Sequence, residues 1–237
     1  EQWDDIHTAT SAGTGNSLFS GTVPLTTNSL TSGFELRDPT RGSHYATNMK
    51  NRTSGGSILT DANNIWGNNQ TTDVATAAVD AVYGQNLTWD YFKTMFNRNG
   101  IANDGRGAYT RVHYSRNYVN AFWSDSCFCM TYGDGDGVTY KPLVTADIAG
   151  HEMTHGITSR TARLVYSGES GGLNEAMSDI FGTLVEHSAP NSIYPANYLV
   201  GERIYTVNNG VSVPTKALRY MFKPSIDTRS PDCYVST

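Results

Sequence analysis

The sequence predicts an α+β fold whose first part is rich in β-strands and whose last part is helical. Two observations support this prediction. Stretches that alternate polar and apolar residues, among many Gly, Ser, Thr and Asn, dominate residues 1–145, apart from one helical segment. The clearest segments of residues 146–237 are instead helical. We therefore expect the boundary between the two regions within or near residues 146–160.

The individual elements follow from local patterns. Residues 1–72 should form strands and loops, with Gly33-Phe34-Glu35-Leu36-Arg37 as one alternating stretch. Residues 73–98 should form one long helix, or two helices with a break near Gly84. The apolar residues at helical spacing there are Val74, Ala77, Ala78, Ala81, Val82, Trp89, Phe92, Met95 and Phe96. Strands should return over 106–145, and two further helices should span about 146–159 and 174–187.

Charge and hydropathy restrict the possible partners. The 237 residues carry a net charge of −5 without a basic cluster, which argues against nucleic acid as a partner. No run of 18 apolar residues is present, so we expect no membrane-spanning helix. The polar start at Glu1-Gln2-Trp3 fits a mature form cut from a zymogen. The low charged fraction (16%) and the 14 tyrosines are typical of a secreted, extracellular hydrolase.

The three cysteines leave two interpretations open. Cys127 and Cys129 are separated by one residue, and Cys233 lies near the end of the chain. All three can be partly buried free thiols. Alternatively, Cys127 and Cys129 form a small disulfide loop and Cys233 pairs with something outside this chain. A cysteine zinc site is disfavoured, because there is no second cysteine pair.

The most informative segment is His151-Glu152-Met153-Thr154-His155. Residues four apart lie on one face of a helix, so both imidazoles can bind a single metal ion. Glu152 lies close enough to reach a water on that metal. The pattern is typical of zinc peptidases, in which the glutamate acts as general base.

A second segment supplies the remaining candidates. Catalytic zinc usually has three protein ligands and one open position. Glu175, in Asn174-Glu175-Ala176-Met177-Ser178-Asp179, is a natural third ligand beside His151 and His155. Asp179 lies four residues later on the same helix face. It is expected to accept the other N–H of His151, because metal-bound histidines normally donate to a carboxylate.

These two motifs together resemble the thermolysin family of secreted neutral metalloendopeptidases. Residues 112–115, 120–123, 130–135 and 178–186 match further family motifs in family order, and the resemblance covers the chain from about residue 14. The family fold has a β-rich N-terminal lobe and a helical C-terminal lobe, with the zinc helix lining the cleft between them. The resemblance thus implies a two-lobed zincin that hydrolyses peptides and proteins.

The resemblance also implies roles for single residues. Tyr166 matches a tyrosine that helps to hold the oxyanion, or is a packing residue. Asn120 and the backbone of Ala121 match the strand that pairs with an extended substrate. Arg219 matches an arginine that hydrogen-bonds a substrate carbonyl, with a surface arginine as the alternative. Five residues match positions that line the pocket for the substrate residue after the scissile bond, although they could equally be residues of the hydrophobic core. They are Tyr140, Leu143, Ile148, Val200 and Leu218. Their character favours a Leu- or Phe-sized side chain.

Calcium is implied in the same way. Asp147, Glu186 and Glu202 align with carboxylates of the principal calcium site, although solvated surface acids are the alternative. Asn197 falls where the family often has Asp, and Leu199 could offer only its backbone carbonyl. A second, adjacent calcium is therefore not expected, which resembles the vibriolysin and pseudolysin branch.

One departure concerns the end of the sequence. The family's helical lobe continues further and carries an Asp-Val-His motif that has no counterpart here. We therefore expect either an endopeptidase that needs a C-terminal fragment of the same precursor for activity, or an inactive or nicked fragment that binds only metal or peptide.

Overall fold

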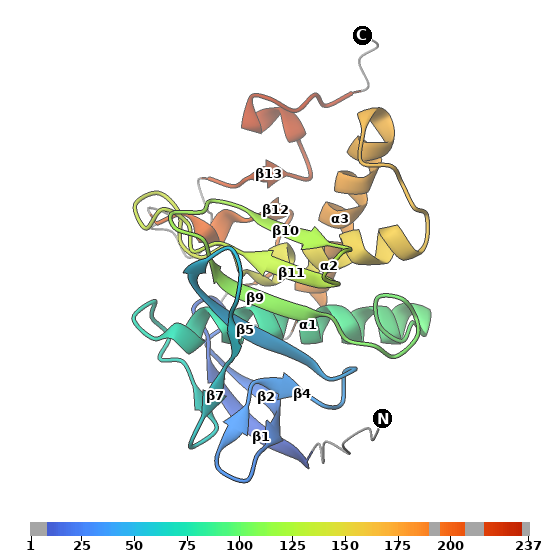
Figure 1. Ribbon diagram of the computed structural model, residues 1–237. Coiled ribbons are helices and arrows are strands. Elements are labelled where there is room, and N and C mark those ends of the chain that lie inside the picture. Colours follow the sequence, from blue (N-terminus) through green and yellow to red (C-terminus); the bar gives the residue numbers. More distant parts are fainter. Residues whose placement is uncertain (1–8, 190–194, 207–215, 234–237) are drawn as a thin grey trace.

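The computed structural model describes residues 9–189, 195–206 and 216–233, and its architecture is shown in Figure 1. A β-rich N-terminal domain precedes a helical C-terminal domain, which confirms the predicted α+β fold. The first sheet has the strand order β7-β3-β2-β1-β8. Its strands are β1 (Ala9–Asn16), β2 (Thr22–Ser29), β3 (Phe34–Glu35), β7 (Thr60–Asp61) and β8 (Ile65–Trp66). None of the helices in these described residues is long and apolar enough to cross a membrane.

The second sheet has six strands. Its order is β10-β11-β9-β5-β4, and β6 pairs with β5 off this path. The strands are β4 (Arg37–Asp38), β5 (His44–Arg52), β6 (Ser57–Ile58), β9 (Tyr109–Tyr114), β10 (Ala121–Ser124) and β11 (Cys129–Tyr132). Strand β10 pairs antiparallel with β11 and lies at the edge of the sheet, so its other side can face a ligand.

Helix α1 (Val74–Phe96) is one unbroken helix rather than two. The side chain of its N-cap, Asp73, accepts a hydrogen bond of 2.7 Å from the amide of Ala75. Gly84 does not break the helix but lets it approach α2, because a Cβ there would lie 2.4 Å from the Cβ of Ala149. Helix α1 packs against β5 and β9 on one side and against α2 and α3 on the other, across the middle of the molecule (Figure 1).

The helical part contains α2 (Ala146–Arg160) and α3 (Gly168–Ser188). Helix α3 begins at Gly168, before residue 174 where we expected its start. The glycines of its first turns lower helix propensity, so the local sequence pattern did not indicate these turns. Two glycines let the helices meet: a Cβ on Gly150 would lie 2.9 Å from the Cα of Gly182. Short elements complete this part, namely β12 (Leu199–Val200) paired with β13 (Arg219–Tyr220), and the 3₁₀ turns Glu202–Ile204 and Pro224–Asp227.

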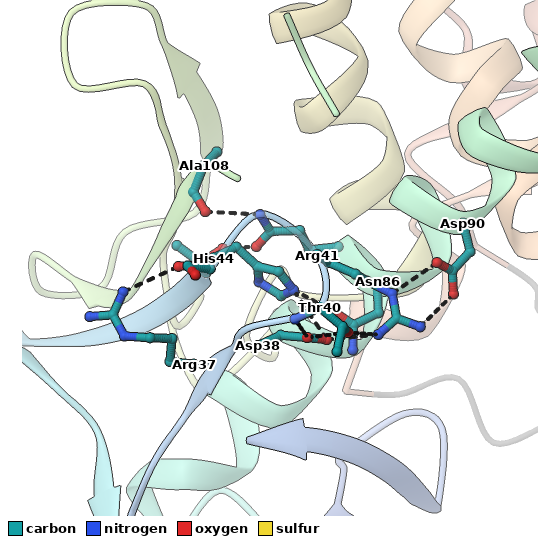
Figure 2. A network of polar contacts seen from close by, with 11 residues as sticks. Arg37, Asp38, Thr40, Arg41, His44, Asn86, Asp90 and Ala108 are labelled. Atoms are coloured by element: carbon teal, nitrogen blue, oxygen red, sulfur yellow. Dashed lines mark hydrogen bonds and ion pairs between the residues drawn. The ribbon is translucent and has the colours of Figure 1, made fainter. Parts of the chain in front are cut away.

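A polar network, buried at Asp38, His44 and Asn86 but exposed at Asp90, ties the segment between β4 and β5 to α1 (Figure 2). The Arg41 guanidinium donates to Asp38 at 2.7 Å and to Asp90 at 2.8 and 2.7 Å. His44 is fully buried, and its Nε2 lies 2.6 Å from Oδ1 of Asn86. Burial lowers the pKa of His44 to about 4, despite the opposing charge of Asp38.

The cysteines settle one of the open alternatives. Cys127 and Cys129 form a disulfide at the turn between β10 and β11. The interpretation of these two residues as free thiols is therefore wrong. Cys233 is an exposed free cysteine within this chain.

Candidate metal centre

Three side chains from two helices converge on one point. His151 and His155 lie one turn apart on α2, and Glu175 lies on α3. The two Nε2 atoms are 3.0 Å apart, and the Glu175 carboxylate oxygens lie 3.2 Å from His151 Nε2 and 3.3 Å from His155 Nε2. Within the described residues, this is the one group of three His, Cys, Asp or Glu side chains whose ligand atoms all lie within 4.8 Å of one another.

Both histidines are oriented by a hydrogen bond at Nδ1. His151 Nδ1 lies 2.7 Å from Oδ1 of Asp179, and His155 Nδ1 lies 2.6 Å from Oδ1 of Asn174. A proton held at Nδ1 by each acceptor would leave both Nε2 lone pairs free to bind a metal together with the Glu175 carboxylate. Two imidazoles and a carboxylate are a ligand set that zinc prefers, so the residues present fit the metal. Sequence reasoning missed Asn174, although it directly precedes Glu175.

Glu152 lies beside these donors and is only 6% exposed. Burial raises the pKa of its carboxyl group, while the charges of His151 and His155 oppose that shift. A carboxylate with a raised pKa is a stronger base than one in water, so the site supplies a proton acceptor beside the metal-ligand candidates.

The remaining polar residues interact with the ligand set. The Tyr166 hydroxyl donates to Oε1 of Glu175, and this bond raises the pKa of Tyr166 to about 12. Burial acts against ionisation of Glu175, but hydrogen bonds from His151, His155 and Tyr166 hold its pKa far below the usual value. Arg219 donates from Nε and, at 2.7 Å, from Nη2 to the Asp179 carboxylate. Asp179 therefore joins Arg219 to His151.

A cleft of about 620 Å³ is lined by all of these groups except Asp179. Strand β10 and its flanks contribute Asn120, Ala121, Phe122, Trp123 and Asp125 to one wall. Of the five candidate pocket residues, Leu143, Ile148 and Leu218 line the cleft. Tyr140 lies outside this lining, where its ring packs on Tyr205 at 5.0 Å between centroids. Val200 is 1% exposed, and its carbonyl accepts a 2.8 Å hydrogen bond from the amide of Leu218.

The acidic residues expected to bind calcium form a separate cluster that begins with Asp147 in the first turn of α2. Asp147, Glu186 and Glu202 are 2, 5 and 2% exposed, and Oε2 of Glu186 has no hydrogen-bond partner among the described residues. Burial and the charge of Asp147 raise the pKa of Glu186 to about 9. Asn197 donates to Oε1 of Glu202 at 3.1 Å. Arg203, which sequence reasoning missed, lies 3.2 Å from Glu186 and 3.3 Å from Glu202.

The cluster fits a cation. Within the described part of the chain, Arg203 contacts two of the three buried carboxylates, burial, Asp147 and Glu202 raise the pKa of Glu186, and Oε2 of Glu186 has no hydrogen-bond partner. Oxygen donors of this kind are those that calcium prefers. Leu199 lies in β12 beside the cluster, and its amide donates to Oδ1 of Asn197 at 2.7 Å.

Comparison with known proteins identifies the family. Residues 12–159 match the family model described as thermolysin metallopeptidase, catalytic domain, and residues 162–237 match the model of its alpha-helical domain. The chain belongs to the thermolysin family. Thermolysin-family enzymes are zinc-dependent peptide hydrolases, and calcium is characteristic of them.

Individual relatives agree with this assignment. The chain is 55% identical to a transglutaminase-activating metalloprotease of Streptomyces mobaraensis over 94% of this chain and 29% of that protein. It is 44% identical to a bacillolysin of Bacillus cereus over 90% of this chain and 36% of that protein. The precursor of protealysin, a metalloproteinase from Serratia proteamaculans, superimposes with a TM-score of 0.60 and 32% identity, covering 75% of this chain and 52% of that chain. The chain thus spans about a third of these two thermolysin-family relatives and half of the solved structure.

Proposed function

We propose that this chain carries the catalytic centre of a secreted zinc endopeptidase. The observation that supports the proposal most strongly is the convergence of His151, His155 and Glu175 beside the buried Glu152 in an open cleft. We propose secretion as well, because the motifs of the chain resemble those of secreted family members. The cleft lies where the regions 1–145 and 146–237 meet.

The residues take distinct roles in peptide hydrolysis. His151, His155 and Glu175 would hold zinc, which when bound supplies Lewis acidity toward a water and a carbonyl group. Glu152 takes a proton from the attacking water and passes it to the leaving amine. Asp179 and Asn174 keep the imidazoles in the tautomer that leaves Nε2 free. Tyr166 is 68% exposed, and its hydroxyl donates to the oxyanion after leaving Glu175.

The cleft also supports a substrate preference. The free edge of β10 suits an extended peptide that adds as a further strand, with Asn120 and Ala121 contacting its backbone. Leu143, Ile148 and Leu218 form an apolar wall that suits a bulky hydrophobic residue after the scissile bond. Arg219 is held by Asp179 at the same end, where it can donate to a substrate carbonyl.

Calcium binding is the structural part of the proposal. Asp147, Glu186 and Glu202 would hold the ion, with Asn197 and the carbonyl of Leu199 as neutral donors. The ion would connect α2, α3 and the segment around β12, because its ligands come from all three.

The test combines metal analysis with peptide hydrolysis. Zinc content and cleavage of a peptide that bears Leu or Phe after the scissile bond are measured on the purified protein, both alone and with a C-terminal fragment of its precursor, and at least one sample should bind zinc and cleave the peptide. Removal of zinc by a chelator should abolish cleavage, and zinc should restore it. A protein that binds zinc and peptide but hydrolyses no peptide would instead be a metal- or peptide-binding remnant.

A further inference from the structure

The turn between β10 and β11 carries a structural device that the proposed chemistry does not use. Ser124 and Cys129 form the last pair of the β10–β11 ladder, and the Cys127–Cys129 disulfide lies directly beyond it. The residue enclosed by the disulfide, Phe128, has φ 51°. This left-handed conformation is uncommon for phenylalanine, so a short covalent ring that restricts the backbone helps to hold Phe128 in it.

Phe128 packs against Trp123, whose side chain lines the cleft. It is 8% exposed, and its ring meets the Trp123 indole edge-on, with centroids 5.3 Å apart. Guanidinium groups cover it as well, with the Cζ atoms of Arg106 and Arg160 at 4.7 and 5.6 Å from the ring centre. Trp123 also packs on Gly156, where a Cβ would lie 2.9 Å from two indole carbons.

Asp125, in the same turn, fastens the hairpin to α2. Its Oδ1 accepts hydrogen bonds from the Trp123 indole at 3.1 Å, the Ser159 hydroxyl at 2.8 Å and the Arg160 guanidinium at 2.8 Å. Gly156, Ser159 and Arg160 belong to the last turns of the helix that carries His151 and His155. The hairpin tip and the metal-binding helix are thus held together through Trp123 and Asp125.

This junction lies at one end of the cleft. The cleft is lined by three residues of this junction, Trp123, Asp125 and Ser159, and also by the apolar residues Leu143, Ile148 and Leu218. Ile148 and Ser159 are separated along α2 by roughly 16 Å, at the usual rise of about 1.5 Å per residue. His151, Glu152 and His155 lie between them. If the apolar end receives the residue after the scissile bond, the Trp123 end receives the residues before it.

We propose that the Cys127–Cys129 disulfide is a positioning element: by fixing Phe128 beneath Trp123, it shapes the part of the cleft that binds peptide residues preceding the scissile bond. This inference rests on the proposed endopeptidase function. The disulfide and Phe128 act through Trp123 and touch neither the metal site nor the scissile bond. Their loss should therefore affect the binding of N-terminally extended peptides more than the chemical step.

The experiment compares two peptides with the same scissile pair, one with a single blocked residue before the cut and one with three residues before it. The variants are Cys127→Ala/Cys129→Ala, Phe128→Ala and the conservative Phe128→Tyr, with Cys233→Ser as the cysteine control. For the extended peptide, the double variant and Phe128→Ala should raise KM about threefold to tenfold, the range expected for losing an aromatic pair. For the same two variants, the kcat of the extended peptide, the KM of the short peptide and the zinc content should stay within about twofold of wild type. Phe128→Tyr should keep the wild-type KM for the extended peptide.

Three results would overturn the proposal: equal losses on both peptides, a loss confined to kcat, or no change on either peptide. Phe128→Ala keeps the test decisive if the double variant does not fold. If the wild-type protein cleaves neither peptide, the proposed function fails separately. The positioning role then still requires that Phe128→Ala weaken calorimetric binding of the extended peptide but not of the short one, and equal binding by both proteins would refute it.

Discussion

The Nδ1 atom of His155 lies 2.6 Å from the Oδ1 atom of Asn174, the residue directly before Glu175. One turn of α3 thus supplies both a metal-ligand candidate and the acceptor that orients another ligand. The amide of Asn174 is itself fixed, because its Nδ2 donates to the carbonyl of Leu164 at 3.1 Å. The orientation of His155 therefore depends on how α3 packs against the segment that follows α2.

Asn174→Ala should weaken zinc binding while leaving the fold intact. Loss of an outer hydrogen-bond partner of a metal-bound histidine typically costs about 10–100-fold in metal affinity. Zinc affinity measured by competition with a chelator checks this. Asn174→Asp keeps the acceptor oxygen but loses the donor to Leu164, so its affinity should lie between those of Asn174→Ala and the wild type. Equal affinities for all three proteins would show that Asn174 does not orient a ligand.

Glu152→Gln should keep zinc bound and lose most turnover. The substitution preserves the size of the side chain and removes its basicity, and loss of a general base typically lowers the rate by about 10²–10⁴-fold. Steady-state peptide hydrolysis and metal content, measured on the same sample, check both parts. Glu169→Gln, an exposed glutamate at the start of α3, is the matched control. Retention of more than about a tenth of the activity would assign the base to another group.

The lowered pKa of buried His44 predicts that the folded protein loses stability on acidification. Its pKa is about 4 in the folded protein and 6.5 in the unfolded chain. Between these values the unfolded chain binds a proton that the folded protein does not, so stability falls as pH falls from about 6.5 to about 4. The limiting slope is about 1.4 kcal/mol per pH unit for one group.

Urea unfolding of wild type and His44→Gln at several pH values between about 4.5 and 7 measures this contribution. The variant has no ionisable group at position 44 in the network of Figure 2 and should lose less stability across the window. All other titrating groups are common to both proteins, so the difference isolates His44. Parallel stability curves would mean that His44 is not neutral in the folded protein.

Calcium should stabilise the folded protein through Asp147, Glu186 and Glu202. A ligand that binds only the folded state adds about 2.7 kcal/mol when present at a hundred times its Kd. Thermal unfolding with and without calcium, at constant zinc, checks this. Glu202→Gln should reduce the calcium-dependent shift in midpoint, and the exposed Asp104→Asn should not. The same midpoint with and without calcium in the wild-type protein would remove the site from the account.

Much of the site could be predicted from local spacing. The i, i+4 positions of His151 and His155 on one helix, and of Glu175 and Asp179 on another, fix which side chains share a face. Sequence alone does not give the distance between the two helices. That distance depends on Gly150 and Gly182, whose missing side chains allow close packing.

Other features depend on contacts that have no sequence period. Arg203 enters the acidic cluster from a 3₁₀ turn, and Asp125 fastens the hairpin to α2 from a loop. Residues in such segments are positioned by tertiary packing rather than by local pattern. The start of α3 was missed for the opposite reason: local propensity opposes a helix at Gly168, Gly171 and Gly172, and the packing of α3 on α2 outweighs it.

The central claim is that His151, His155 and Glu175 together bind zinc, and its most direct test is the zinc affinity of Glu175→Ala. The wild-type protein should bind one zinc ion per chain. Glu175→Ala should bind it more weakly by more than the roughly 10–100-fold that loss of an outer partner causes. Glu169→Ala, on the same helix, should bind zinc as the wild type does. An unchanged zinc stoichiometry and affinity in Glu175→Ala would contradict the account.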